Sequence, residues 1–146
     1  MTDPTVNRIH LTLQSTLDSV ELVEELAEMF ARRAGFDEDS ASQIAMVSRE
    51  ATVNAVVHGN KYDPAKQVKV SFAINGDTFR IHIADQGSGV DADNLPDPVA
   101  PENLMKTSGR GIFLMRAIMD EVHFHMLTPG TEIEMVKHRD QKEIHP

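Results

Sequence analysis

Three short blocks along the chain contain residue types that suit the binding of a nucleotide. They read EATVNAVVHGN at 50–60, DQGSG at 85–89 and SGRGIFL at 108–114. Each block alone is a weak motif, because short matches often arise by chance. Their order, and their expected positions on a helix, at a strand end and at a helix start, together indicate ATP.

In the first block, Glu50, Asn54 and His58 are spaced four residues apart, which places them on one stripe of a helix. Small and branched apolar neighbours indicate that this helix is buried on most sides. The side-chain oxygen of Asn54 suits Mg²⁺, and Glu50 could hold a water on the metal or remove a hydroxyl proton. The alternative is a solvent-facing glutamate and a C-terminal asparagine in an ordinary amphipathic helix.

In the second block, Asp85 has the same parity as the apolar residues of the strand expected at 79–83, so it is predicted to face the buried side. A carboxylate there needs a hydrogen-bond donor, and the exocyclic amine of adenine would serve. Gly87 and Gly89 let the backbone bend sharply and approach a flat ligand. The alternative is a tight turn in which the aspartate bonds its own backbone.

The third block opens a helix whose N-terminus would favour an anion. It offers bare backbone amides, two hydroxyls and two positive charges, and it lacks the Walker pattern. The candidate phosphate contacts are Lys106, Thr107, Ser108, Gly109, Arg110 and Gly111. The alternative is a serine-capped helix with glycines for close packing.

The elements that must position these blocks follow from hydrophobic periodicity. Helices are expected from about Leu17 to Gly35, from Asp39 or Ser40 to His58, and from Arg110 to Met119; strands are expected at 8–14, 68–74, 79–83, 121–126 and 131–137. This order predicts an α+β fold, with one mixed, mostly antiparallel sheet covered on one face by helices. We expect a single domain over 1–138 and a polar tail over 139–146, and the long segment from Gly87 to Thr107 is expected to be functional.

The composition excludes several classes of protein. With 146 residues, 40% of them apolar, the chain suits one domain with a core. It has no cysteine, so disulfides, thiolate metal sites and a cysteine nucleophile are excluded. A net charge of −9 argues against direct binding to nucleic acid. No apolar run suits a membrane span and no secretory signal is visible, so a cytoplasmic protein is expected.

His123 and His125 share one face of an expected strand, a spacing that a metal ion could use. No third ligand is visible in the sequence, and zinc sites need three or four protein ligands. A metal site at these histidines is therefore the weaker reading.

Taken together, a helix with Glu-x-x-x-Asn, then Asp-x-Gly-x-Gly at a strand end and Gly-x-Gly at a helix start, resembles the GHKL ATPase superfamily. That superfamily includes histidine-kinase ATP domains, gyrase-type ATPases and Hsp90. The short length, EATVNAVVHGN, SGRGIFLMRAIMDEV and the closing EIEMVK resemble the bacterial anti-sigma-factor serine kinases of the RsbW/SpoIIAB type. The resemblance covers nearly the whole chain and implies the Bergerat-type ATP-binding sandwich.

The resemblance implies roles by position. Glu50 would be the general base, Asn54 would coordinate Mg²⁺, and Asp85 would bind adenine. Residues 90–107 would form the ATP lid. The full set of predicted nucleotide contacts is Asn54, His58, Asn60, Lys61, Asp85, Gly87, Gly89, Val90, Lys106, Thr107, Ser108, Gly109, Arg110, Gly111 and Ile112.

The activity that the resemblance implies is ATP-dependent phosphorylation of a serine or threonine on a small anti-anti-sigma protein of the STAS type. Such kinases bind a sigma factor when that partner is phosphorylated, and many are homodimers. Two alternatives remain open: a non-catalytic ATP-binding module that sequesters a partner protein, and a sensor-kinase ATP domain that acts on a histidine in trans. Neither nucleic acid nor membrane is an expected direct partner.

Overall fold

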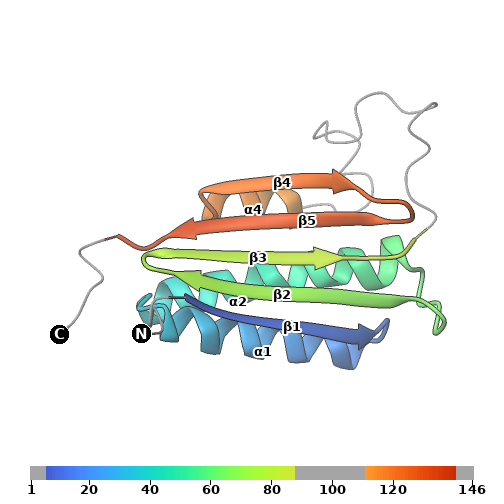
Figure 1. Cartoon of the computed structure of the whole chain (residues 1–146), viewed down its shortest axis with the longest axis horizontal. Helices are drawn as coiled ribbons and strands as arrows, with labels where there is room; N and C mark the ends of the chain where they lie inside the picture. The colour runs from blue at the N-terminus through green and yellow to red at the C-terminus, as the bar shows by residue number, and fades with distance from the viewer. Residues whose placement is uncertain (1–5, 88–110, 141–146) are drawn as a thin grey trace.

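The molecule has two layers, a sheet and a set of helices that pack on one of its faces (Figure 1). The computed structural model describes residues 6–87 and 111–140. The elements are β1 (Val6–Gln14), α1 (Leu17–Arg33), α2 (Glu38–Val53), η1 (Asn54–Gly59), β2 (Gln67–Asn75), β3 (Thr78–Ala84), α4 (Gly111–Ile118), β4 (Glu121–Met126) and β5 (Thr131–His138). None of the helices in these two ranges is long and apolar enough to cross a membrane.

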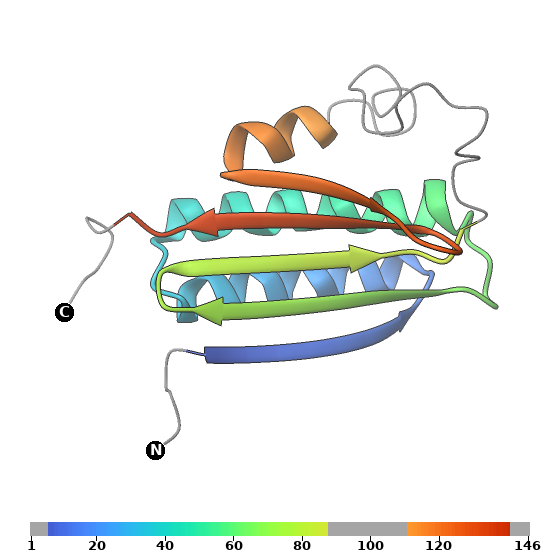
Figure 2. The same cartoon turned by 45° about the horizontal axis from the view of Figure 1, so that its top comes forward.

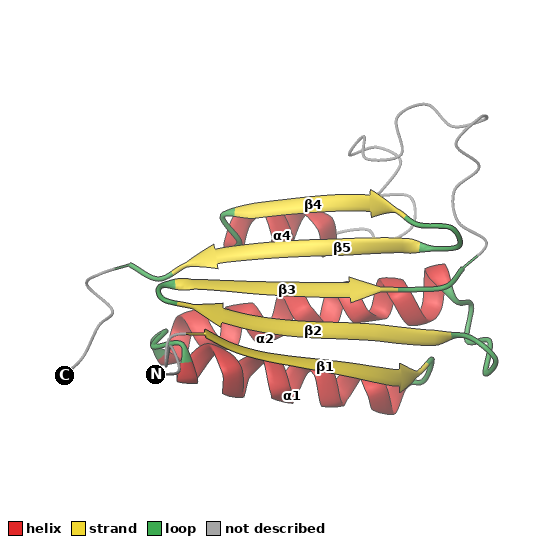
Figure 3. Ribbon diagram, in the orientation of Figure 1, coloured by secondary structure: helices red, strands yellow, loops and turns green. Residues whose placement is uncertain are grey.

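The five strands form one sheet in the order β1-β2-β3-β5-β4 (Figure 3). The prediction of a mixed sheet was wrong for the described strands, because every neighbouring pair is antiparallel. β5 lies between β3 and β4, which run in the same direction, and so keeps these two parallel strands apart. The α+β class, with helices on one face, is confirmed, and a view turned by 45° shows the same two layers (Figure 2).

Side-chain caps begin the two long helices. Thr16 Oγ1 accepts a hydrogen bond from Ser19 N at 3.2 Å before α1, and Asp37 Oδ1 accepts one from Ser40 N at 2.8 Å before α2. The α1 boundaries agree with the prediction, but Leu17 at its first position is 55% exposed and lies outside the core.

The prediction of one α-helix as far as His58 was wrong in the last turn. α2 ends at Val53 and continues as the π-helix η1, in which Asn60 N donates to Ala55 O at 2.8 Å. A π-helix has wider turns than an α-helix, with bonds between residues five apart. Four residues make slightly less than one turn of a π-helix and slightly more than one turn of an α-helix, so Asn54 and His58 still lie on the same side of η1.

The core lies between the layers, where the apolar stripes of α1 and α2 meet alternate residues of β2 and β3. Phe72 on β2 is fully buried; its ring centroid lies 5.4 Å from that of Phe30 on α1 and 6.0 Å from that of Phe79 on β3. Such aromatic pairs add to the free energy of burial. These three rings join the helical layer to the two strands that lead to the second block.

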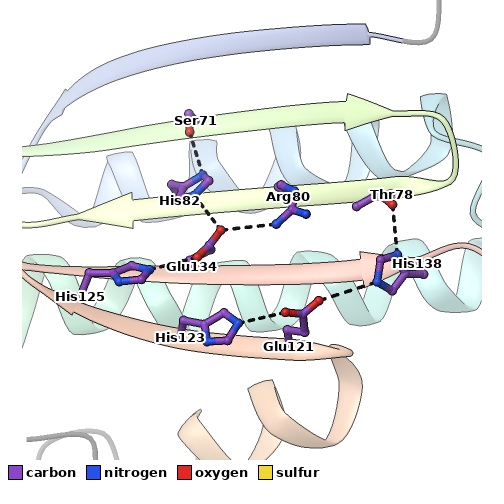
Figure 4. A network of polar contacts seen from close by, with 9 residues as sticks. All are labelled: Ser71, Thr78, Arg80, His82, Glu121, His123, His125, Glu134 and His138. Carbon is purple, nitrogen blue, oxygen red and sulfur yellow. Dashed lines mark hydrogen bonds and ion pairs between the residues drawn. The ribbon is translucent and has the colours of Figure 1, made fainter.

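The other face of the sheet carries charged and polar side chains (Figure 4). Glu134 on β5 accepts a hydrogen bond from His125 Nε2 at 3.0 Å and also pairs with His82 Nε2 at 3.2 Å and Arg80 Nη1 at 3.5 Å. The hydrogen bond from His125 and the contacts of His82 lower the pKa of Glu134, although partial burial acts in the opposite direction. Glu134 therefore links β3, β5 and β4 across this face.

We expect Phe72→Ala to lower the free energy of unfolding by about 3–5 kcal/mol, because it removes a fully buried ring and leaves a cavity. Chemical denaturation would measure the change. Phe113→Ala is the matched control, since Phe113 on α4 is 67% exposed, and it should change stability by less than about 0.5 kcal/mol. Equal effects of the two substitutions would contradict this account of the core.

We expect Glu134→Gln to lower the free energy of unfolding at pH 7 by about 1–2 kcal/mol, because charge-assisted hydrogen bonds are lost. The folded-state pKa of Glu134 lies below its ordinary value of 4.5, so its stabilisation is complete above pH 4.5 and is lost as the pH falls through the folded-state pKa. The difference between wild type and variant should therefore shrink below pH 4.5. Glu21→Gln, exposed on α1, is the control; a deficit for Glu134→Gln that is independent of pH would contradict the assignment.

Candidate functional site

Three segments that are distant in the sequence meet at one end of the molecule, on the right in Figure 1. They are the end of β3, the end of η1 and the turn between β4 and β5. The residue on which they converge is Asp85, which directly follows β3.

Asp85 is only 9% exposed, which confirms the prediction that it faces the buried side. Its Oδ1 accepts hydrogen bonds from two backbone amides, Gly87 N at 3.0 Å and Thr131 N at 3.2 Å. Its own N–H donates to Thr131 O at 2.9 Å. Both ends of the residue are thus tied to the start of β5, and the direction of the carboxylate is fixed.

Glycines surround this carboxylate because no larger residue would fit. A Cβ on Gly59 would overlap Asp85 Oδ2, and one on Gly87 would overlap the carbonyl of Gly59. Gly130 has φ +106°, and a Cβ there would overlap the carbonyl of Asp85. Gly59 and Gly130 were not among the predicted site residues, although Gly59 lies within the first block, EATVNAVVHGN.

The second carboxylate oxygen, Asp85 Oδ2, is free for a ligand as far as the described residues go. None of the donors in 6–87 and 111–140 reaches it. A carboxylate oxygen only accepts hydrogen bonds, so this position calls for a ligand N–H or O–H group. The site therefore fits a flat ligand with an exocyclic amine, such as adenine.

Burial raises the pKa of Asp85 above its ordinary range. The two amide donors, Gly87 and Thr131, and the positive charge of Lys66 oppose this rise. The net effect is that the folded protein holds this carboxylate at a cost in free energy, which a hydrogen-bond donor on the ligand would reduce.

Glu50 and Asn54 lie on either side of the junction between α2 and η1, and both are half-buried. Neither side chain makes a hydrogen bond or ion pair with another described residue. A carboxylate and an amide oxygen one turn apart are the kind of oxygen ligands that suit Mg²⁺. His58, the third residue of the predicted stripe, is exposed, whereas Glu50 and Asn54 are half-buried.

The segment after η1 has an unusual backbone. Lys61 and Tyr62 have φ values of 53° and 59°, in the left-handed region that non-glycine residues seldom adopt. Two backbone bonds hold them there: Tyr62 N donates to Val56 O, and Asp63 N donates to Asn60 O, both at 2.9 Å. Strained backbone of this kind gathers at ligand sites. Lys61, a predicted phosphate contact, is exposed on this segment.

Asn60 has a structural environment that the sequence did not indicate. Its side chain is 1% exposed and donates to Ser15 Oγ at 2.6 Å and to Gln67 O at 2.9 Å. Both amide protons are used, so the predicted phosphate contact of Asn60 has no side-chain donor left.

The third block lies mostly outside the described residues. Gly111 and Ile112 begin α4 and are buried against the rest of the domain. The other predicted contacts of this block and of the lid, together with one glycine of the second block, fall outside: Gly89, Val90, Lys106, Thr107, Ser108, Gly109 and Arg110.

The histidines of β4 pair with carboxylates and do not assemble a metal site. His125 bonds Glu134, and His123 Nε2 lies 3.0 Å from Glu121 Oε1, which also pairs with His138 at 3.8 Å (Figure 4). Within 6–87 and 111–140, histidine and acidic side chains nowhere form a group of three that could hold a metal ion.

Known proteins share this sequence pattern over most of the chain. A sequence model of the family described as histidine kinase-like ATPase domain matches residues 13–137. The chain is 29% identical over 137 residues to a protein named anti-sigma F factor from Anoxybacillus flavithermus, with 90% of this chain and 92% of the relative covered. It is 24% identical over 144 residues to serine-protein kinase RsbW of Listeria monocytogenes, with 94% and 91% covered.

Solved structures share the fold. The RsbU and RsbW domains of Rv1364c from Mycobacterium tuberculosis match with a TM-score of 0.66 and 21% identity, over 90% of this chain and 32% of that one. The catalytic domain of histidine kinase ThkA matches with a TM-score of 0.56 and 14% identity, over 90% and 98%. With the family match spanning both the first and second blocks and the fold in agreement, the chain belongs to the family of histidine kinase-like ATPase domains.

Proposed function

We propose that this protein is an ATP-dependent serine/threonine protein kinase that phosphorylates a small anti-anti-sigma protein of the STAS type and also binds a sigma factor. The observation that carries the proposal is Oδ2 of Asp85, which accepts no hydrogen bond from the described residues and lies in a glycine-lined pocket bordered by Gly59, the last residue of η1. Glu50 and Asn54 lie on the helical segment that ends at Gly59. Membership of the ATPase family and the names of the two relatives support it.

The pocket would select adenine through Asp85. Its Oδ2 would accept a hydrogen bond from the exocyclic amine of adenine, where guanine carries a carbonyl oxygen. An acceptor facing an acceptor is unfavourable in a buried site, so the carboxylate would exclude GTP. The backbone bonds of Gly87 and Thr131 supply the rigidity that such a preference needs.

Glu50 would act as the general base in the transfer. It would take the proton of a substrate serine or threonine hydroxyl, whose oxygen forms a bond to the γ-phosphorus of ATP while the bond to the leaving ADP oxygen breaks. The amide oxygen of Asn54 would hold Mg²⁺, which supplies charge neutralisation at the phosphates when it is bound. Backbone amides at the start of α4, Gly111 among them, would face the phosphates.

We expect Glu50→Gln to reduce phosphotransfer by about 10²–10⁴-fold while ATP binding is retained, because the variant loses the base and keeps the pocket. The measurement is incubation of the purified chain with γ-labelled ATP, Mg²⁺ and host lysate. An acid-stable labelled small protein, seen with wild type and with the control Glu25→Gln on exposed α1 surface, is the expected result.

Other outcomes would redirect the proposal. An acid-labile product would indicate phosphohistidine and a sensor-kinase ATP domain acting in trans. Tight ATP binding with no labelled protein would favour a non-catalytic module that sequesters its partner. Unchanged transfer by Glu50→Gln would show that another group is the base.

We expect Asp85→Asn to weaken ATP binding by about 10–100-fold, because its amide would present a donor to the adenine amine. The same change should stabilise the nucleotide-free protein at neutral pH. The folded-state pKa of Asp85 is raised, so the ionised carboxylate costs stability as the pH rises through that value, and the neutral amide does not. Calorimetric titration with ATP and GTP, and thermal melts over a pH series, would measure both effects; equal wild-type affinity for the two nucleotides would contradict the adenine assignment.

A further inference from the structure

Asn60 is the most deeply buried amide side chain among the described residues, and all of its polar atoms are engaged. Nδ2 donates to Ser15 Oγ at 2.6 Å and to Gln67 O at 2.9 Å, and Oδ1 accepts from Gln86 N at 2.8 Å. These partners lie at the end of β1, the start of β2 and the residue after Asp85. One side chain thus joins three segments of the chain. We call Asn60 and its three partners, Ser15, Gln67 and Gln86, the Asn60 cluster.

The chemistry of the partners fixes the orientation of the amide. The backbone N–H of Gln86 can only donate, so the atom that faces it must be the Asn60 oxygen. The carbonyl of Gln67 can only accept, so the atom that faces it must be the nitrogen. A flipped amide would lose both bonds and set like groups against each other in a buried site.

The cluster closes on itself through Gln86. The side chain of Gln86 accepts a hydrogen bond from Gln67 N at 2.9 Å, while its backbone N–H is held by Asn60. Ser15 Oγ donates onward to Lys66 O at 3.0 Å. Gln86 is therefore fixed at its backbone by Asn60, which precedes β2, and at its side chain by Gln67, the first residue of β2.

Gln86 lies between Asp85 and Gly87, the two residues that shape the carboxylate pocket. Gly87 N is one of the two donors to Asp85 Oδ1, and a Cβ on Gly59, the neighbour of Asn60, would overlap Oδ2. A rotation of the peptide at Gln86 would move the Gly87 donor and the carboxylate together. Holding Gln86 N at 2.8 Å is thus a means of holding Asp85.

We propose that Asn60 is a positioning residue for base selection, which acts through Gln86 on Asp85 and does not contact the phosphates. The inference rests on the proposed function, because it takes the Asp85 pocket as the site of the nucleotide base. Within the block EATVNAVVHGN, the proposal thus places Asn60 near the base of the nucleotide and Asn54, the proposed Mg²⁺ ligand, near its phosphates.

The test is a double-mutant cycle read by calorimetric titration with ATP on wild type, Asn60→Ala, Asp85→Asn and the double variant. Asn60→Ala is expected to weaken ATP binding by about tenfold and to narrow the ratio of ATP to GTP affinity, since the acceptor for Gln86 N is lost. In the Asp85→Asn background the same change should weaken ATP binding less than twofold, because Asn60 acts through Asp85.

Two further variants separate positioning from general stability. Ser48→Ala removes a different buried hydrogen bond, which Ser48 Oγ donates to Ile44 O at 2.8 Å within α2, outside the Asn60 cluster. It should lower the melting temperature and leave ATP affinity unchanged. Asn60→Asp keeps an acceptor for Gln86 N, so it should retain the ATP-to-GTP ratio even where it is less stable than wild type.

The outcomes distinguish the inference from the function on which it rests. If Asp85→Asn weakens ATP binding and the Asn60→Ala loss is fully additive to it, the positioning role is overturned and the adenine site stands. The positioning role is also overturned if Asn60→Ala leaves the ratio of ATP to GTP affinity unchanged. It is overturned as well if Asn60→Asp narrows this ratio as much as Asn60→Ala does. If Asp85→Asn itself leaves ATP affinity unchanged, the adenine site fails and the inference fails with it.

Discussion

A buried carboxylate held by backbone amides is the constraint on which the rest of the site depends. Asp85 has no ion pair with any described residue, so its charge is met by the N–H groups of Gly87 and Thr131. Amides can reach it only where β3 and β5 are neighbours and where Gly59, Gly87 and Gly130 leave room. The burial of Asp85 therefore depends on the strand order, on the conformation of the β4–β5 turn and on the position of the end of η1. Both amide bonds go to Oδ1, so Oδ2 can accept a hydrogen bond from a ligand.

The wide turn of η1 connects the carboxylate pocket to the Glu50–Asn54 pair. If the α-helix continued to His58, Gly59 and Asn60 would lie at different positions relative to Asp85. The π-helical bonds, followed by two left-handed residues, instead return the chain so that Gly59 lies against Asp85 and Asn60 enters the interior. Departures from regular helix often mark functional sites because they aim side chains that a regular helix cannot. Here one irregular segment carries Asn54 at its start and places Gly59 against Asp85 at its end.

Local patterns predicted most of the fold and part of the site. Alternation at 79–83 predicted that Asp85 faces the buried side, and apolar spacing located α1. The predicted start of α2 at Asp39 or Ser40 lies just after its first residue, Glu38. What the sequence could not show depended on partners distant along the chain. The antiparallel placement of β5 between β3 and β4, the use of Gly130 against Asp85, and the enclosure of Asn60 by Ser15 and Gln67 are long-range facts. The π-turn has no composition signature that distinguishes it from the α-helix it extends, so the sequence could not indicate that α2 ends at Val53.

The bond between Thr131 N and Asp85 Oδ1 spans 46 residues of sequence and crosses the whole third block. During synthesis, β3 leaves the ribosome well before β5, so for that interval Asp85 lacks one of its two donors and the turn that encloses it. A site closed by the β4–β5 hairpin cannot bind a base until β5 has been synthesised. Nucleotide binding would then stabilise chains that contain β5 over chains that stop before it, because only the former supply the Thr131 donor.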